Sequence, residues 1–100
     1  MISFKLMSSQ DIAVEMAVRV RGRRLAQNLS LEGLARRSGV ALGTLKKFEH
    51  TGQIALVSFI RLVLSLKDEA ALENLLLEQP FETLDEILQS EKKPKRGRIK

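Results

Sequence analysis

The sequence contains no cysteine, tryptophan or tyrosine, and it has only two prolines and one histidine. Without cysteine the chain can form neither a disulfide nor a cysteine–zinc site, which fits a reducing cytoplasm. A single histidine and the lack of a glycine-rich phosphate loop leave no nucleophile–base pair for catalysis. An enzyme is therefore the least expected class, and we expect neither a metal nor a cofactor.

Long apolar runs are also missing. The densest one, residues 54–66, is interrupted by Ser58, Arg61 and Ser65 and falls short of a membrane span. Residues 1–10 hold one lysine and no long apolar run, so no signal peptide is expected. The sequence therefore predicts a cytoplasmic protein without a membrane partner.

Helix-forming residues dominate the chain, and both prolines lie late in it, at positions 80 and 94. One hundred residues suffice for one small core, so we predict an all-α domain. We expect an N-terminal extended segment over 1–8, a folded domain over 9–90 and a flexible basic tail over 91–100. The expected helices cover about 9–27, 31–38, 42–50, 56–66, 69–77 and 83–90. The alternation of Ile2, Phe4 and Leu6 is a short strand period that either pairs with a second subunit or packs onto the bundle, and packing is favoured.

The net charge of +5 is the sum of three unlike segments. Residues 1–67 carry 11 Lys and Arg against 4 Asp and Glu, residues 68–90 carry none against 7, and residues 91–100 carry 6 against 1. A basic head, an acidic middle and a basic tail suggest separate surfaces for separate partners. The alternative is that the acidic stretch only offsets the charge of the head within the fold.

The most informative stretch is 31–50, which has the pattern of two short helices joined by a tight turn. Ser30 is a suitable N-cap for the first helix, and Gly39 stands where that helix must end in a left-handed conformation. The inward-facing residues of the two helices and the turn are Leu34, Ala35, Val40, Leu45 and Phe48. Because Ala35 is small, the helices can cross closely at a steep angle.

This spacing resembles the helix-turn-helix of the XRE family, the Cro and phage-repressor type of DNA-binding domain, over roughly residues 16–66. The residues that match the family pattern are Arg24, Leu29, Ser30, Leu34, Ala35, Gly39, Thr44, Leu45, Phe48 and Glu49. The resemblance implies a lambda-repressor-like helical bundle with one or two extra C-terminal helices. It also implies a partly buried ion pair between Arg24 and Glu49, where the alternative is two unrelated surface charges.

In this family the second helix of the motif reads base edges in the DNA groove. Matched residue by residue, the base-edge positions are Ala41, Leu42, Gly43, Thr44 and Lys47. Phage repressors place polar side chains at the first three positions, so here direct readout is sparse and DNA shape contributes more. The expected phosphate contacts come from Arg19, Arg21, Arg23, Arg36, Arg37, Lys46, His50, Thr51 and Gln53.

The resemblance implies a bacterial transcriptional repressor that binds double-stranded operator DNA as a homodimer, because one motif offers little contact area. The apolar surplus that predicts the dimer surface comprises Leu72, Leu75, Leu76, Leu77, Phe81, Leu84, Ile87 and Leu88. The layout further resembles short HipB-like antitoxins encoded beside HipA-type kinase toxins, which makes such a toxin a second expected partner. The alternatives are a stand-alone repressor and a protein-interaction scaffold with vestigial DNA binding.

The C-terminal tail contains Arg96-Gly97-Arg98, which resembles the core of an AT-hook. True hooks flank this core with prolines, whereas Lys95 and Ile99 stand there in this chain. A bare basic tail that attracts any polyanion is the favoured interpretation. Contact with anionic lipid is a further alternative, although no neighbouring amphipathic anchor supports it.

Overall fold

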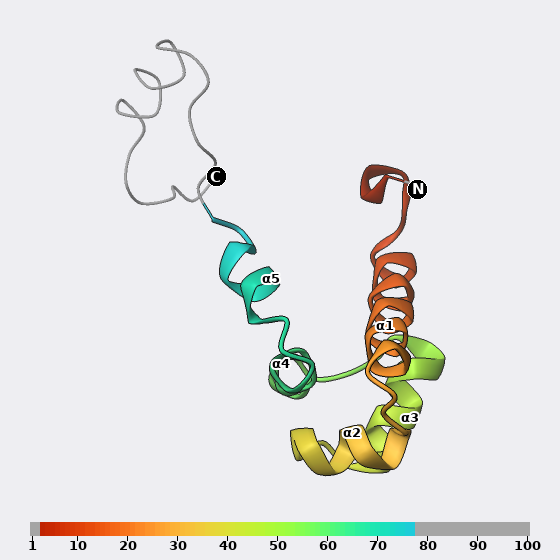
Figure 1. The fold of residues 1–100 in the computed structure, drawn as a ribbon. Helices are drawn as coiled ribbons and strands as arrows, with labels where there is room; N and C mark the ends of the chain where they lie inside the picture. Colours follow the sequence, from red (N-terminus) through yellow and green to blue (C-terminus); the bar gives the residue numbers. More distant parts are fainter. Residues whose placement is uncertain (1–2, 78–100) are drawn as a thin grey trace.

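The computed structural model describes residues 3–77. The elements are a short 3₁₀ turn, η1 (Phe4–Leu6), followed by α1 (Ser9–Ala26), α2 (Leu31–Ser38), α3 (Leu42–Thr51), α4 (Leu56–Ser65) and α5 (Glu69–Asn74) (Figure 1). Every element in this part of the chain is helical, so the predicted all-α class is confirmed. The helix expected at 83–90, the basic tail and the apolar residues at 81–88 lie outside the described residues.

Residues 3–7 do not form a strand. Phe4–Leu6 is a 3₁₀ turn that leaves the Leu6 side chain 83% exposed. Phe4 does meet the bundle, because the Arg19 guanidinium lies 5.0 Å from the centre of its ring. The favoured packing onto the bundle is therefore present at Phe4, whereas the extended conformation predicted for this segment is replaced by a 3₁₀ turn at residues 4–6.

The start of α1 agrees with the sequence. Ser8 is its N-cap: the Ser8 hydroxyl accepts a hydrogen bond from the Asp11 amide, and the Asp11 carboxylate accepts one from the Ser8 amide. This reciprocal capping box satisfies two amides that the first helical turn leaves without partners.

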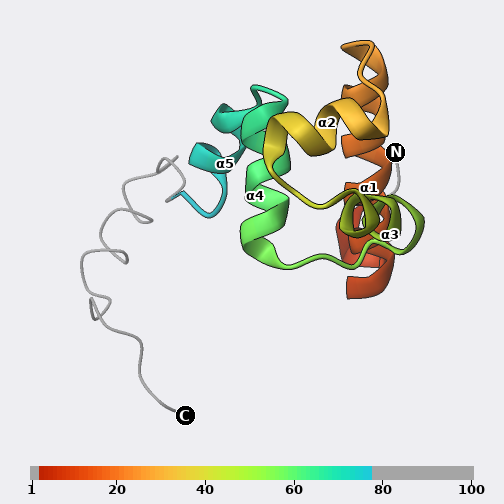
Figure 2. The ribbon, with the colours of Figure 1, turned by 90° about the horizontal axis from the view of Figure 1, so that it is seen from below.

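The helices enclose one small core. Helix α1 packs along α3, while α2 lies across the ends of α3 and α4 (Figures 1 and 2). The largest fully buried side chains are Leu34, Leu45, Phe48 and Leu62, one or two from each of α2, α3 and α4. The Phe48 and Phe59 rings meet edge to face with centres 5.9 Å apart. Burial of each large side chain stabilises the fold by about 1.5–3 kcal/mol, so this cluster fixes how α3 sits against the rest.

The apolar spacing of the first helix predicts an inward stripe of Ile12, Met16, Val20 and Leu25, and the inward face of α1 differs from it. Leu25, expected to point inward, is 51% exposed, whereas Ala17 and Arg24 are buried beside Val20. The physical reason is helical periodicity: Ala17, Val20 and Arg24 are spaced by three and four residues and share one face of α1, whereas Leu25 lies about 100° further round the helix. On α4 the sequence indicated Phe59, Ile60, Val63 and Leu66 as core residues but missed Leu62, which is fully buried.

Gly52 marks the closest approach of α1 and α3. It ends α3 with a left-handed backbone, φ +81°, and a Cβ atom at this position would lie only 2.7–2.9 Å from backbone atoms of Ala13 and Val14. The Gln10 side-chain amide also donates to the Thr51 carbonyl at 2.9 Å. The end of α3 is therefore fixed against the first half of α1.

Helix α5 ends at Asn74, three residues earlier than expected, and none of its residues is buried. Leu76 has a left-handed φ of +61°, which is incompatible with a continuing helix. The side chains of Leu75, Leu76 and Leu77 are 65%, 93% and 60% exposed. The break before α5, predicted at Lys67-Asp68, is present, with Lys67 also left-handed.

Candidate nucleic-acid interface

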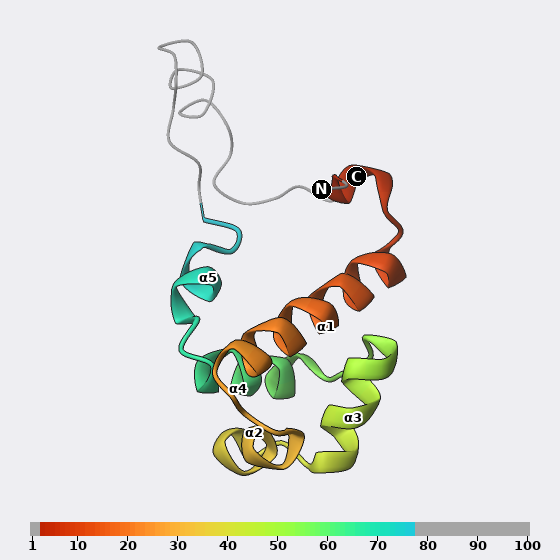
Figure 3. The same cartoon turned by 45° about the vertical axis from the view of Figure 1, so that its right-hand side comes forward.

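Helices α2 and α3 are joined by three residues, 39–41, and cross steeply (Figure 3). The Ser30 hydroxyl caps α2 by accepting from the Gly33 amide at 2.9 Å. Gly39 ends α2 with φ +76°, as predicted, and its amide donates to the Ala35 carbonyl. Val40 turns inward and is 4% exposed, so the turn is fixed by core packing as well as by its glycine.

Helix α3 has one buried and one exposed side. Leu45 and Phe48 are buried in the core, whereas Gly43, Thr44 and Lys47 are exposed. Among the other expected base-edge positions Ala41 is exposed and Leu42 is half-buried. The exposed residues of the first turns therefore present a short, partly cationic surface, which we call the α3 face (Gly43, Thr44, Lys46 and Lys47).

The expected ion pair between Arg24 and Glu49 is present and nearly buried, with side chains 8% and 10% exposed. Arg24 Nε and Nη2 donate to the two Glu49 carboxylate oxygens at 2.9 and 3.0 Å, and Nη1 donates to the Leu29 carbonyl at 2.9 Å. Because one guanidinium bonds α3 and the α1–α2 connection together, it fixes the orientation of the α3 face.

Three of the expected phosphate contacts gather beside this ion pair. Arg21, Lys46 and His50 line a shallow depression of about 280 Å³, whose other walls are Arg24, Leu31 and Glu49. All three side chains are exposed. Since Arg24 is neutralised by Glu49, the cationic character of this depression comes from Arg21 and Lys46.

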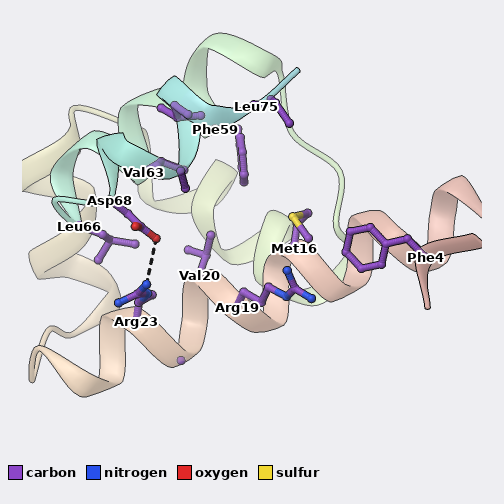
Figure 4. A pocket seen from close by; sticks show the side chains of 13 residues that line it. Phe4, Met16, Arg19, Val20, Arg23, Phe59, Val63, Leu66, Asp68 and Leu75 are labelled. Carbon is purple, nitrogen blue, oxygen red and sulfur yellow. Dashed lines mark ion pairs between the residues drawn. The ribbon is translucent and has the colours of Figure 1, made fainter. Parts of the chain in front are cut away.

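Arg19 and Arg23 are separated from that cluster. Arg19 pairs with Glu15 at 3.0 Å and Arg23 pairs with Asp68 at 3.3 Å, and both line a groove between α1 and α4–α5 (Figure 4). The structure therefore does not bring Arg19, Arg21 and Arg23 together on one face of α1, and their contacts to phosphate remain predictions. Helical periodicity explains the difference: residues four apart share a face, whereas Arg21 lies two positions from each and points elsewhere.

The remaining expected phosphate contacts differ in their surroundings. Arg36 and Arg37 are exposed in the last turn of α2, where they also complement the helix dipole. The Thr51 hydroxyl donates to the Lys47 carbonyl at 2.7 Å and accepts from the Gln53 amide at 3.1 Å. Thr51 thus serves as a local cap, and Gln53 beyond it is exposed.

One feature that the sequence analysis missed is the start of α3. Its N-cap, Ala41, makes no side-chain hydrogen bond to the helix, whereas serines cap α1 and α2. The first amides of α3 are therefore not satisfied by a capping side chain and remain suited to an anion. The signal was visible in the sequence as an alanine at the position where the preceding helices have serine.

Within residues 3–77 no three His, Asp or Glu side chains cluster as metal ligands would. None of the helices in this range combines the length and apolar content needed to cross a bilayer. No family model, curated protein or solved structure matched the chain. Function must therefore be argued from the site itself.

Proposed function

We propose that this protein is a sequence-specific DNA-binding transcriptional repressor of the XRE helix-turn-helix type, with α3 as its recognition helix. The observation that carries the proposal is the combination of an exposed α3 face with a nearly buried ion pair behind it. A helix held on its inner side and free on its outer side can enter a major groove without rearrangement, which lowers the entropic cost of binding.

In this proposal the α3 face divides its contacts between bases and backbone. Lys47 and Thr44 donate hydrogen bonds to base edges, and Gly43 permits close approach to the groove. Arg21, Lys46 and His50, which share one depression, contact phosphates on one side of α3. The phosphate contacts supply affinity, and sparse base readout leaves part of the specificity to DNA shape.

The repressor is proposed to act in the bacterial cytoplasm as a homodimer on a two-fold symmetric operator. The exposed side chains of Leu76 and Leu77 supply a part of the predicted dimer surface that lies within the described residues. More specifically, we propose an antitoxin that represses its own operon and binds a HipA-type kinase toxin. Inspection of the adjacent gene and co-purification of the native complex test this version. An adjacent gene without kinase motifs, together with a protein that purifies alone, would leave only the stand-alone repressor.

Replacing Lys47 by alanine is expected to weaken binding to DNA from the protein's own promoter region by about 1–3 kcal/mol, the usual contribution of one base-reading side chain. Thr44→Ala is expected to change affinity in the same direction. Both side chains are exposed, so folding should not be affected. Lys67→Ala is the matched control, because Lys67 is an exposed lysine in the break between α4 and α5.

Electrophoretic mobility shift and footprinting at several salt concentrations provide the measurement. Lys46→Ala should weaken binding to specific and unrelated DNA alike and lower the salt dependence by about one phosphate contact. A protein-interaction scaffold would show no footprint and would respond to none of these variants, and that outcome would remove the proposal.

Ala41→Asp is expected to change stability and DNA affinity in opposite directions. A carboxylate at the uncapped start of α3 should raise the free energy of unfolding by about 0.5–2 kcal/mol. It should also repel a phosphate bound by the same amides, so affinity for DNA should fall. Ala41→Ser is the control, since it caps the helix without adding charge. If Ala41→Asp binds DNA as tightly as Ala41→Ser, no phosphate lies at the start of α3.

A further inference from the structure

A groove lies between α1 and the arm formed by α4 and α5, and it has a volume of about 690 Å³. Its lining is mainly apolar and includes Met16 and Val20 from α1, Phe59 and Val63 from α4, Leu72 from α5, and Leu75, which follows α5 directly (Figure 4). It is separate from the depression that holds Arg21, Lys46 and His50. A mainly apolar cleft of this volume is typical of a binding site.

The sequence that follows Leu77 has the pattern such a groove would bind. On a helix, Phe81, Leu84, Ile87 and Leu88 would lie along one face, because they are spaced by three, three and one residues. The acidic residues Glu82, Asp85 and Glu86 would lie on the other face, and residues 81–88 contain no Lys or Arg. Segment 81–88 is thus amphipathic and acidic.

The connection to this segment is short. Residues 78–80 separate Leu77 from Phe81, and four extended residue steps span about 14 Å. Leu75, two residues before Leu77, lines the groove itself, so the described chain ends beside it (Figure 4). A tether this short gives an effective concentration in the millimolar range, which favours binding within one chain over binding to a second copy.

We propose that segment 81–88 binds as a helix in the α1/α4–α5 groove of its own chain, with its apolar face towards Met16, Val20 and Val63. Its acidic face then lies beside Arg19 and Arg23 on the groove wall. These side chains are 45% and 62% exposed and already pair with Glu15 and Asp68, but each guanidinium carries further N–H donors. The apolar contacts and the short tether therefore contribute more to the binding of segment 81–88 than charge does.

This proposal gives a different role to the C-terminal apolar residues that the sequence assigned to a dimer surface. Phe81, Leu84, Ile87 and Leu88 complete the chain's own core and do not form a dimer surface. Leu76 and Leu77, 93% and 60% exposed, remain for contact with another molecule. The proposal is independent of DNA binding, because none of the groove-lining residues belongs to the α3 face.

The full-length chain has no cysteine, so an engineered pair reports this contact without interference. In the variant Met16→Cys/Leu84→Cys, oxidation is expected to form a disulfide within one chain, seen as a compact monomer on a non-reducing gel. Met16→Cys/Glu86→Cys is the matched control, because position 86 lies on the opposite face of the segment. Its disulfide should form about tenfold more slowly, since its thiol is directed away from the groove.

Each other outcome overturns the proposal. Equal oxidation rates for the two pairs would mean that the segment does not bind the groove in a defined orientation. Disulfides formed only between chains, detected by mixing isotopically light and heavy protein, would mean that the groove binds the segment of a second copy. Circular dichroism of the reduced variants establishes whether they are folded. If the variants that carry Met16→Cys do not fold, Val20→Cys/Leu88→Cys supplies a second pair for the same test.

Discussion

Replacement of Gly52 by alanine is expected to destabilise the protein by about 2–5 kcal/mol. A left-handed backbone costs an alanine roughly 1–2 kcal/mol, and forcing an extra methyl group into filled space costs about 1–3 kcal/mol more. At Gly52 both penalties apply, because φ is +81° and the new Cβ would lie 2.7–2.9 Å from the backbone of α1. Backbone atoms, unlike the end of a flexible side chain, cannot move aside without shifting the helix.

Gly39 provides a matched control for this substitution. It also ends a helix with a left-handed backbone, φ +76°, but no atom lies within 4 Å of a Cβ built there. Gly39→Ala should therefore cost only the backbone term, about 1–2 kcal/mol. The free energies of unfolding in urea, compared at equal m-values, measure both effects. Equal losses for the two variants would show that α1 and the end of α3 are not in close contact.

Loss of one partner of the Arg24–Glu49 pair is expected to cost about 3–5 kcal/mol, because the remaining charge is left nearly buried without a counter-ion. Arg24→Met should be at least as harmful as Glu49→Leu, since it also removes the hydrogen bond to the Leu29 carbonyl. Arg24→Lys should not retain the stability of the unsubstituted protein, because an ammonium group cannot make the two-point contact with the carboxylate.

The double variant Arg24→Met/Glu49→Leu should recover much of the lost stability, since no uncompensated charge remains. Thermal and urea unfolding of the four proteins in this cycle give the coupling energy between the two side chains. The exposed pair of Arg19 and Glu15 is the control, and Glu15→Gln should change stability by no more than about 0.5 kcal/mol. A coupling energy between Arg24 and Glu49 of no more than about 0.5 kcal/mol would mean that the pair does not fix the orientation of α3.

The described fold follows closely from local sequence signals where those signals are strong. Ser30 caps α2 as the sequence indicates, and Gly39 ends that helix in the expected conformation. The bounds of α2 agree with the prediction, because a capping serine and a left-handed glycine define both ends by local hydrogen bonding. The end of α5 had no such signal, and there the prediction was wrong by three residues.

The candidate site was only partly visible in the sequence. Thr44, Lys46 and Lys47 lie on the exposed side of α3, as the spacing of Leu45 and Phe48 requires. The division of the α1 arginines was not predicted, although their spacing contained the information. Arg19 lies beside Phe4 and Glu15, and Arg23 lies beside Asp68 (Figure 4); these positions depend on which face of α1 meets the core.

The sequence by itself determined where the helices α1–α4 lie, how α2 is capped at both ends and which side of α3 is apolar, because these properties depend on residues a few positions apart. Only the tertiary structure decided that Ala17 rather than a larger residue faces α3, that Gly52 has no room for a side chain, and that Arg21 is grouped with Lys46 and His50. Such relations join residues far apart in the chain. They are set by how closely two helices approach and how each is rotated about its axis, which local propensity does not fix.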